Sequence, residues 1–220
     1  MIRTITLLCF SAMLFSCNST DKPEDTAVET ANEKIVDTTS ATVNYVPIDT
    51  DEALIATALL AAPAASRDGA KVIGYNTAGE FTTLREGDNE FIVLVDDSSR
   101  DGFNAAAYHK DLEPFMARGR ALRAEGKAPD EIFAIREAEM KSGTLSIPQG
   151  ATLHIYFGPK TNYNPETAEV EGAKLRYVVY IPFATAESTG LPESPVAANH
   201  PWIMNPGTHR AHIMISPINE

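Results

Sequence analysis

The spacing of hydrophobic residues changes several times along the chain, and each change marks a different type of element. Apolar residues recur at helical spacing over residues 54–60. Thr50 or Asp51 can cap the start of this segment, and Pro63 limits its length. We therefore expect the first folded element to be a helix that begins near Thr50.

Extended segments follow the first helix. Residues 71–75 and 80–84 have the composition of strands and are separated by turn residues at 76–79, which predicts a β-hairpin. Residues 91–95 then form a continuous apolar run that ends at Asp96. Such a run is typical of a strand that is covered on both faces, so we predict that it lies in the centre of a sheet.

Two helices are predicted next, and together they form a helical hairpin. The first lies between residues 110 and 125 and ends at Gly126. The second begins at Pro129, because the fixed φ of proline suits the first turn of a helix, and it continues to Met140. One face of the first helix carries Leu112, Phe115, Met116, Gly119 and Leu122, whereas Arg118, Arg120 and Arg123 are expected to point away from that face.

Strand-like segments return in the C-terminal part, at residues 152–157, 175–181 and 210–215. Strands that stand before and after a group of helices favour an α+β fold. We predict an antiparallel or mixed sheet of about five to six strands, with the helical hairpin and the N-terminal helix packed on one face of it.

The N-terminus has the features of an export signal. A positive charge at Arg3 precedes an apolar stretch at residues 5–15, which is too short to span a bilayer as a helix of about 20 residues. The run Leu14-Phe15-Ser16-Cys17 resembles the lipobox of bacterial lipoproteins. This resemblance implies that residues 1–16 are removed and that Cys17 is acylated, which anchors the chain to a membrane. The alternative is a plain secretory signal in which Cys17 is incidental.

The segment after Cys17 is predicted to be a tether. Residues 17–49 are acidic and rich in Thr, Ser and Asn, and they cannot bury enough apolar surface to fold alone. Residues 50–220 then form a single globular domain. Asn18 stands where an aspartate often retains lipoproteins at the inner membrane, so the resemblance favours the outer membrane, on either its periplasmic or its outer face.

Cysteine usage and charge narrow the chemistry of the domain. Cys9 belongs to the predicted signal and Cys17 to the anchor, so the domain itself holds no cysteine. Disulfides, thiolate metal sites and cysteine nucleophiles are therefore excluded from it. The formal net charge of -12 argues against a nucleic-acid partner, because a phosphate backbone repels an acidic chain that has no basic patch.

The three C-terminal strands each alternate apolar and polar residues, so each has one polar face. If the strands are neighbours in matching register, their polar faces form one surface that can bind an anionic or aromatic ligand. The alternative is a half-exposed sheet whose outer face is simply polar. The predicted surface consists of His154, Tyr156, Arg176, Tyr180, Arg210 and His212.

A second arrangement would allow catalysis. His109 precedes the helical hairpin and is expected to lie near Asp96, and a histidine beside a carboxylate can act as a general base. A periplasmic hydrolase-like enzyme could use this histidine or the pair His154 and His212. His209 and His212 are three apart and face opposite ways on a strand, so we expect no metal site. No common catalytic or cofactor motif occurs, and no cofactor is expected.

Two further segments resemble a family of uncharacterised exported bacterial proteins. They are the run that begins Tyr108-His109-Lys110-Asp111 and continues to Arg123, and the later Met204-Asn205-Pro206-Gly207-Thr208. The resemblance covers roughly residues 52–216 and implies export and a single domain, but no activity. We predict an envelope lipoprotein that reaches the membrane through acylated Cys17 and binds a small ligand or an envelope protein without catalysis.

Overall fold

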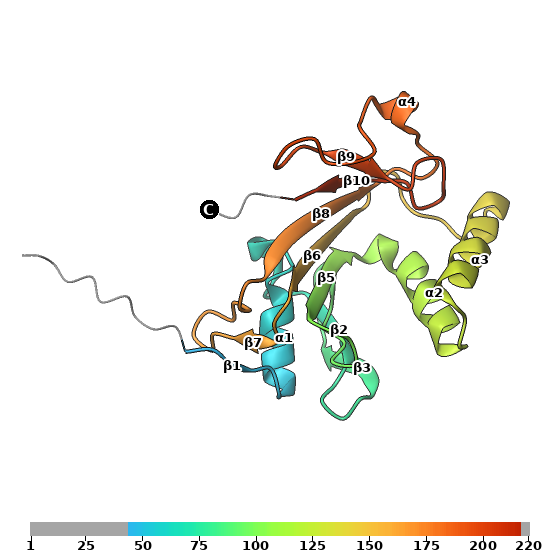
Figure 1. The fold of residues 1–220 in the computed structure, drawn as a ribbon. Coiled ribbons are helices and arrows are strands. Elements are labelled where there is room, and N and C mark those ends of the chain that lie inside the picture. The colour runs from blue at the N-terminus through green and yellow to red at the C-terminus, as the bar shows by residue number, and fades with distance from the viewer. Residues whose placement is uncertain (1–43, 217–220) are drawn as a thin grey trace, which may run out of the picture. The chain divides into compact units, whose positions relative to one another are not determined.

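The computed structural model describes residues 44–216, and these form an eight-stranded main sheet, a two-stranded second sheet and several helices (Figure 1). The predicted α+β class is confirmed, although the main sheet has more strands than the five to six expected. Its strand order is β3-β2-β4-β5-β6-β8-β10-β9, and all neighbours are antiparallel except β2 and β4. The strands are β2 (Lys71–Tyr75), β3 (Phe81–Arg85), β4 (Phe91–Leu94), β5 (Phe103–His109), β6 (Thr152–Gly158), β8 (Lys174–Tyr180), β9 (Trp202–Met204) and β10 (His212–Ile215).

The helices begin and end close to the predicted positions. Thr50 caps the first helix, since its side-chain oxygen accepts a hydrogen bond from the Ala53 N–H at 3.1 Å. The predicted helical hairpin is confirmed, and Gly126 lies in its turn with a φ of 79°, a left-handed conformation that glycine adopts easily. The helices of the described part are α1 (Asp51–Leu59), α2 (Glu113–Ala124), α3 (Pro129–Ser142) and α4 (Ala186–Thr189), with short 3-10 turns η1 (Ala64–Ser66) and η2 (Lys110–Leu112).

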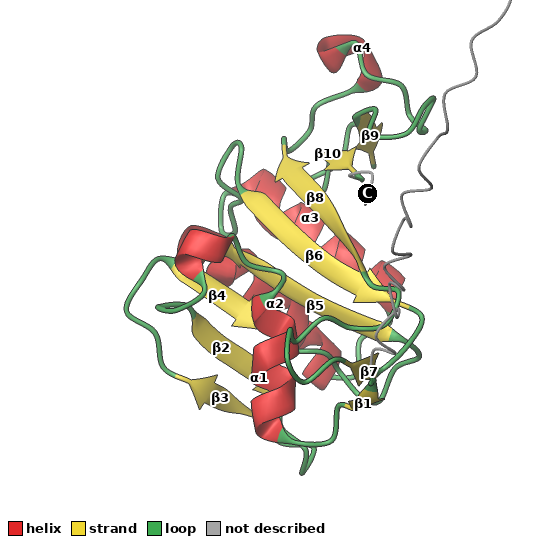
Figure 2. Ribbon diagram, turned by 90° about the vertical axis from the view of Figure 1, so that its left-hand side faces the viewer, coloured by secondary structure: helices red, strands yellow, loops and turns green. Residues whose placement is uncertain are grey.

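The helices cover both faces of the sheet, so the prediction that they share one face was wrong. Helix α1 packs on the face that carries Val72 and Val93. Helix α2 packs on the opposite face, where Phe115 contacts the cluster around Tyr108 and Val178. Figure 2 shows α1 in front of the sheet and α2 and α3 behind it. The reason is that the interior strands are apolar on both sides, and each side must be shielded from water.

Strand β5 lies in the middle of the sheet but was not predicted. Its central residues are Ala105, Ala106 and Ala107, and alanine is depleted in strands. In the structure these residues are at most 8% exposed, because α1 lies over one face of β5 and α2 over the other. Small side chains in β5 therefore allow the two helices to approach the sheet closely.

The domain begins earlier than the predicted boundary at residue 50. Strand β1 (Val46–Pro47) pairs with β7 (Asn162–Tyr163) in the second sheet, so the end of the predicted tether belongs to the folded part. The predicted signal, Cys17 and the tether up to residue 43 lie outside the described residues. None of the helices within residues 44–216 combines the length and hydrophobicity needed to cross a membrane.

Candidate ligand-binding site

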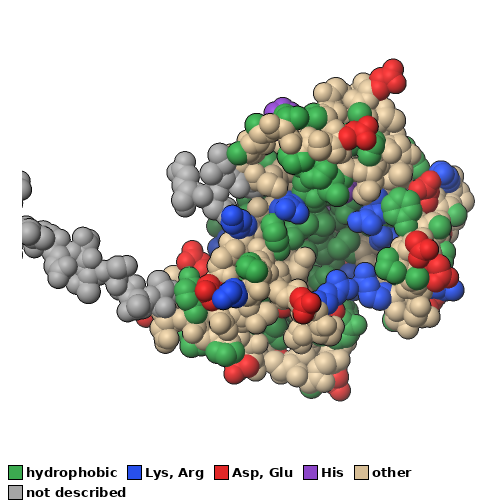
Figure 3. Space-filling model, viewed as in Figure 1, with side chains coloured by type: hydrophobic (Ala, Val, Ile, Leu, Met, Phe, Trp, Pro, Cys, Tyr) green, Lys and Arg blue, Asp and Glu red, His purple; other side chains and the backbone are tan. Residues whose placement is uncertain are grey.

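A pocket of about 430 Å³ lies between the sheet and the C-terminal half of α2, and we call it the α2 pocket. In Figure 3 the molecule is hollowed between the sheet and the α2–α3 hairpin, with hydrophobic side chains at the bottom of the hollow and Lys and Arg side chains around it. The walls of the α2 pocket include Tyr75, Phe81, Leu94, Asp96, Asn104 and Ala106 from the sheet side and Arg120 and Arg123 from α2.

Arg120 joins α2 to the sheet and does not point away from it as the helical pattern predicted. Its guanidinium donates to the Tyr108 hydroxyl at 3.3 Å and to the Glu113 carboxylate, and it lies over the Phe81 ring at 5.5 Å. Burial of Tyr108, together with the Glu113 carboxylate beside it, raises the pKa of this tyrosine. These contacts hold the Arg120 side chain in place, and it forms part of the wall of the α2 pocket.

Asp96 follows the end of β4, as the sequence predicted, and it lines the α2 pocket. The side chain is 6% exposed, and its Oδ1 accepts a hydrogen bond from the Asn104 N–H at 2.8 Å. Burial raises the pKa of the carboxyl, while the Asn104 hydrogen bond opposes this shift. Arg100 binds the neighbouring Asp97 at 3.2 Å and leaves Asp96 without an ion-pair partner among the described residues.

Arg136 of α3 crosses over α2 and is buried against the sheet side of the hairpin. It is 9% exposed, and its guanidinium lies 4.1 Å from the centre of the Phe115 ring. It donates one long hydrogen bond, 3.4 Å, to the Phe115 carbonyl. A Cβ at Gly119 would lie 2.8 Å from the Arg136 Nη1, so the glycine makes room for this guanidinium. Hence two helices and one aromatic ring hold Arg136 in place.

Arg136 lies close to other positive charges and has no carboxylate of its own. Burial, followed by the charge of Arg210 and a smaller effect of Arg123, lowers the pKa of Arg136 to about 10. Glu139 opposes this shift weakly, but its carboxylate is bound by Arg118 at 2.7 Å. We call Arg123, Arg136 and Arg210 the arginine cluster. Within residues 44–216 none of the three forms an ion pair, whereas Arg100, Arg118 and Arg120 do.

Two buried histidines lie beside the arginine cluster. His209 is 0% exposed, lies 4.6 Å from the Phe133 ring and has its Nδ1 3.4 Å from Glu137. His212 is 5% exposed, and its Nδ1 lies 2.6 Å from the Arg210 carbonyl. Burial lowers the pKa of both rings, so near neutral pH they are uncharged and do not add to the positive charge of the cluster.

The predicted catalytic pair does not form. His109 lies at one end of β5, while Asp96 bonds to Asn104, five residues and about 17 Å away along the same strand. The Nδ1 of His109 accepts a hydrogen bond from the Asp111 N–H at 3.2 Å, and its Nε2 faces Glu90 at 3.7 Å. The prediction placed His109 near Asp96 because it did not include β5, the strand that separates them.

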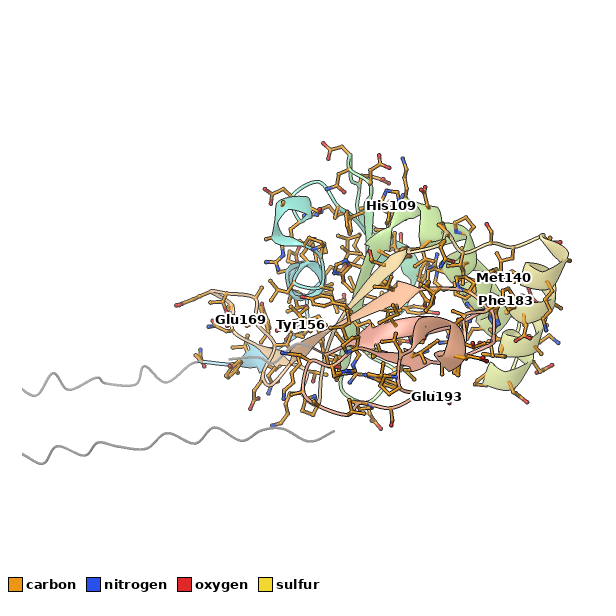
Figure 4. The ribbon with its side chains drawn as sticks, turned by 90° about the horizontal axis from the view of Figure 1, so that it is seen from above. His109, Met140, Tyr156, Glu169, Phe183 and Glu193 are labelled. Atoms are coloured by element: carbon orange, nitrogen blue, oxygen red, sulfur yellow. The ribbon has the colours of Figure 1, made fainter. Side chains whose placement is uncertain are left out.

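The predicted polar surface is also divided, in this case between two faces of the sheet. His154 pairs with Tyr177 and not with Arg176, so it lies on the α1 face, as does Tyr156. Arg176, Tyr180 and His212 lie on the opposite face, and Arg210 precedes β10. The Tyr156 hydroxyl accepts a hydrogen bond from the Val170 N–H at 3.0 Å, and Figure 4 shows Tyr156 well apart from His109.

Comparison with protein-family models, with curated proteins and with solved structures finds no match to this chain. Within the described part, no three His, Cys, Asp or Glu side chains lie close enough together to hold a metal ion.

Sequence reasoning missed Arg136, although two signals pointed to it. Arg136 stands four residues after Ile132, which places it on the apolar side of the second helix. Gly119 is the one residue without a side chain on the apolar face of the first helix. A long charged residue opposite such a gap can be buried in it, and this is what the structure shows.

Replacing Asp96 with asparagine is expected to stabilise the domain at high pH. A raised pKa means that Asp96 favours the folded state at low pH, and this contribution is lost as the pH rises through the folded-state pKa. The asparagine side chain would keep an acceptor for the Asn104 N–H and would carry no buried charge. The melting temperature of Asp96→Asn should exceed that of wild type at pH 8, and the gain should shrink towards pH 4. Asp97→Asn, which loses a bond to Arg100, is the control and should show no such gain; a lower melting temperature for Asp96→Asn at pH 8 would contradict this account.

Proposed function

We propose that this chain is a lipid-anchored protein of the cell envelope and that its anchor lies in the outer membrane. We further propose that its domain binds an anionic ligand with an apolar body. The lipobox-like run that ends at Cys17 supports the anchor. The arginine cluster and the apolar walls of the α2 pocket support the ligand. The proposal assigns no catalytic step to the domain.

The observation that carries the proposal is the buried, unpaired guanidinium of Arg136. A buried charge without a partner is costly, and proteins normally pair such a charge or bind an ion to it. Arg210 and Arg123 increase this cost because they carry the same charge. A carboxylate or phosphate placed among the three arginines would relieve the repulsion and could accept paired hydrogen bonds from a guanidinium.

The size and the lining of the α2 pocket favour a ligand with an apolar body. Its volume of about 430 Å³ is in the range of pockets that enclose small molecules. Leu94 and Ala106 form its floor, and Ile155 lies beside Ala106 on the same face of the sheet. An amphiphilic anion would place its apolar part on this floor and its head towards Arg123, the member of the arginine cluster that lines the pocket.

The histidines and the carboxylate that the hydrolase alternative requires lie apart from one another. His109 is the last residue of β5, and Asp96 is hydrogen-bonded to Asn104 near the other end of that strand. His154 and His212 lie on opposite faces of the sheet, and Phe91 and Tyr177 surround His154 at 6.2 and 5.3 Å between ring centres. No histidine of the described part therefore stands beside a carboxylate in the α2 pocket, and binding is the function that we propose.

Acylation at Cys17 can be tested directly in a bacterial host. Cells that express the full chain should incorporate labelled palmitate into it, and globomycin, which blocks the lipoprotein signal peptidase, should cause a longer precursor to accumulate. Cys17→Ala should abolish the labelling. Cys9→Ala is the matched control, since Cys9 lies in the removed segment, and it should be labelled like wild type. Equal labelling of the Cys17→Ala chain would show that the signal was misinterpreted.

Ligand binding can be tested with small amphiphiles and the unacylated chain from residue 18 to residue 220. Octanoate and octyl phosphate should bind in isothermal titration, and octyl glucoside, which has the same chain and an uncharged head, should not. Arg136→Met keeps much of the side-chain volume but removes the charge. It should weaken octanoate binding at least about tenfold, which corresponds to about 1.4 kcal/mol.

The matched control for this experiment is Arg118→Met. Arg118 belongs to the same helical hairpin, but its guanidinium is bound by Glu139 and Glu125. This variant should bind octanoate like wild type. The proposal fails if octyl glucoside binds as well as octanoate, or if Arg118→Met and Arg136→Met weaken binding equally.

A further inference from the structure

The carboxylate of Asp96 faces the α2 pocket from the sheet. Residues two apart along a strand share a face, so Asp96 lies on the same face as Leu94, which packs in the cluster around Phe115. The side chain of Asp96 is 6% exposed, and this small exposed part opens into the pocket that the residue lines. The proposed function gives a role to arginines at this site and none to Asp96.

Strand register places an aromatic pair beside Asp96. Ile73 pairs with Leu94 where β2 and β4 run parallel, and the same register continued by two residues sets Tyr75 beside Asp96. Tyr75 pairs with Phe81 of β3, and the centres of their rings lie 5.3 Å apart. One row across the sheet therefore holds Phe81, Tyr75 and Asp96, and all three line the α2 pocket.

Asp96 is a buried carboxylate whose charge is not paired. Its Oδ1 accepts a hydrogen bond from the Asn104 N–H at 2.8 Å, and a backbone N–H carries no net charge. Among the described residues Asp96 forms no ion pair, because Arg100 binds Asp97 instead, at 3.2 Å. Burial raises the pKa of the Asp96 carboxyl, while the N–H groups of Asn104 and Asp97 favour its ionised form. A cation placed at Asp96 would relieve the cost of this buried charge.

The aromatic pair adds to the attraction for a cation, since the face of an aromatic ring attracts positive charge. Arg120 already lies over the Phe81 ring at 5.5 Å, but within the described part of the chain no cation lies over Tyr75. Tyr75 is 41% exposed, so a ligand can reach its ring. On the opposite wall, Arg123 of α2 can bind an anionic group.

We propose that the α2 pocket binds a zwitterionic amphiphile, with its ammonium group at Asp96, its anionic group at Arg123 and its apolar part on the floor of the pocket. This inference rests on the proposed function and adds a cationic group to the ligand. A ligand without such a group would leave the Asp96 carboxylate buried and unpaired.

The test compares three ω-amino fatty acids with the fatty acids of the same length, in isothermal titration at neutral pH. The pairs are 6-aminohexanoate and hexanoate, 8-aminooctanoate and octanoate, and 10-aminodecanoate and decanoate. In a purely apolar pocket the amino group should weaken binding, because a charge would be removed from water. We expect the amino acid of at least one pair to bind about tenfold or more tightly than its fatty acid, because the ammonium gains charge-assisted hydrogen bonds.

Variants assign this preference to Asp96. Asp96→Asn removes the charge and keeps an acceptor for the Asn104 N–H, so the fatty acid should now bind more tightly than the amino acid. Asp101→Asn is the matched control, since it removes the same charge from an exposed residue outside the pocket, and it should keep the wild-type preference. Tyr75→Leu should reduce the preference about two- to fivefold, and it serves if the melting curve of Asp96→Asn shows no folded domain.

The possible failures are distinguishable. If octanoate binds in a manner that depends on Arg136 but no amino acid binds more tightly than its fatty acid, the inference is wrong and the proposed function stands. A preference that Asp96→Asn leaves at the wild-type value also overturns the inference. If only the amino acids bind, and Asp96→Asn abolishes this binding, the inference holds and the octanoate prediction of the proposed function fails. If no compound binds to wild type, both proposals fail.

Discussion

Arg136 lies buried between the helical hairpin and the sheet, where its guanidinium passes Gly119 and stacks on Phe115. The position of this one charge relates the fold to the proposed site. It is held by α2, α3 and the cluster around Phe115, yet among the described residues it donates only one long hydrogen bond, to the Phe115 carbonyl, and forms no ion pair with a carboxylate. The framework thus fixes the position of the charge. In the proposed function a bound anion compensates this charge, and the ligand-free domain is less stable for that reason.

The rest of the site follows from how much of the sheet the helices cover. Alanines at the centre of β5 bring α1 and α2 close to the two faces of the sheet. The first turn of α2 packs on β8 through Phe115 and Tyr180, and its last turns lie near Tyr75 and Phe81 of β2 and β3. On the same face of the sheet, Phe157 and Arg176 line a cavity whose other side is formed by the loop 195–200.

The elements that the sequence predicted are those with local signals. The α1 cap at Thr50, the turn between β2 and β3, and the break at Gly126 each depend on a few neighbouring residues, and all are confirmed. Strand β5 has no such signal, because its alanines are selected by close packing on both faces.

The site was less predictable, since its geometry depends on contacts between distant segments. Alternation along β6 and β8 shows that each strand has two kinds of face, but it does not show how the strands are registered. A shift of one residue exchanges the faces, and His154 and Arg176 are separated for that reason. Arg136 stands on the apolar side of α3, but the room for its buried guanidinium comes from Gly119, 17 positions earlier in α2.

The central claim is that Arg136 is an uncompensated buried charge, and the most direct test is the stability of the ligand-free domain. Wild type and Arg136→Met, both unfolded and refolded to remove bound molecules, should be compared by urea denaturation at neutral pH. If the charge is uncompensated, the methionine variant should be more stable than wild type by about 1 kcal/mol or more, with an unchanged m-value. A methionine variant that is less stable than wild type would contradict the claim, because it would show that the guanidinium stabilises the empty domain.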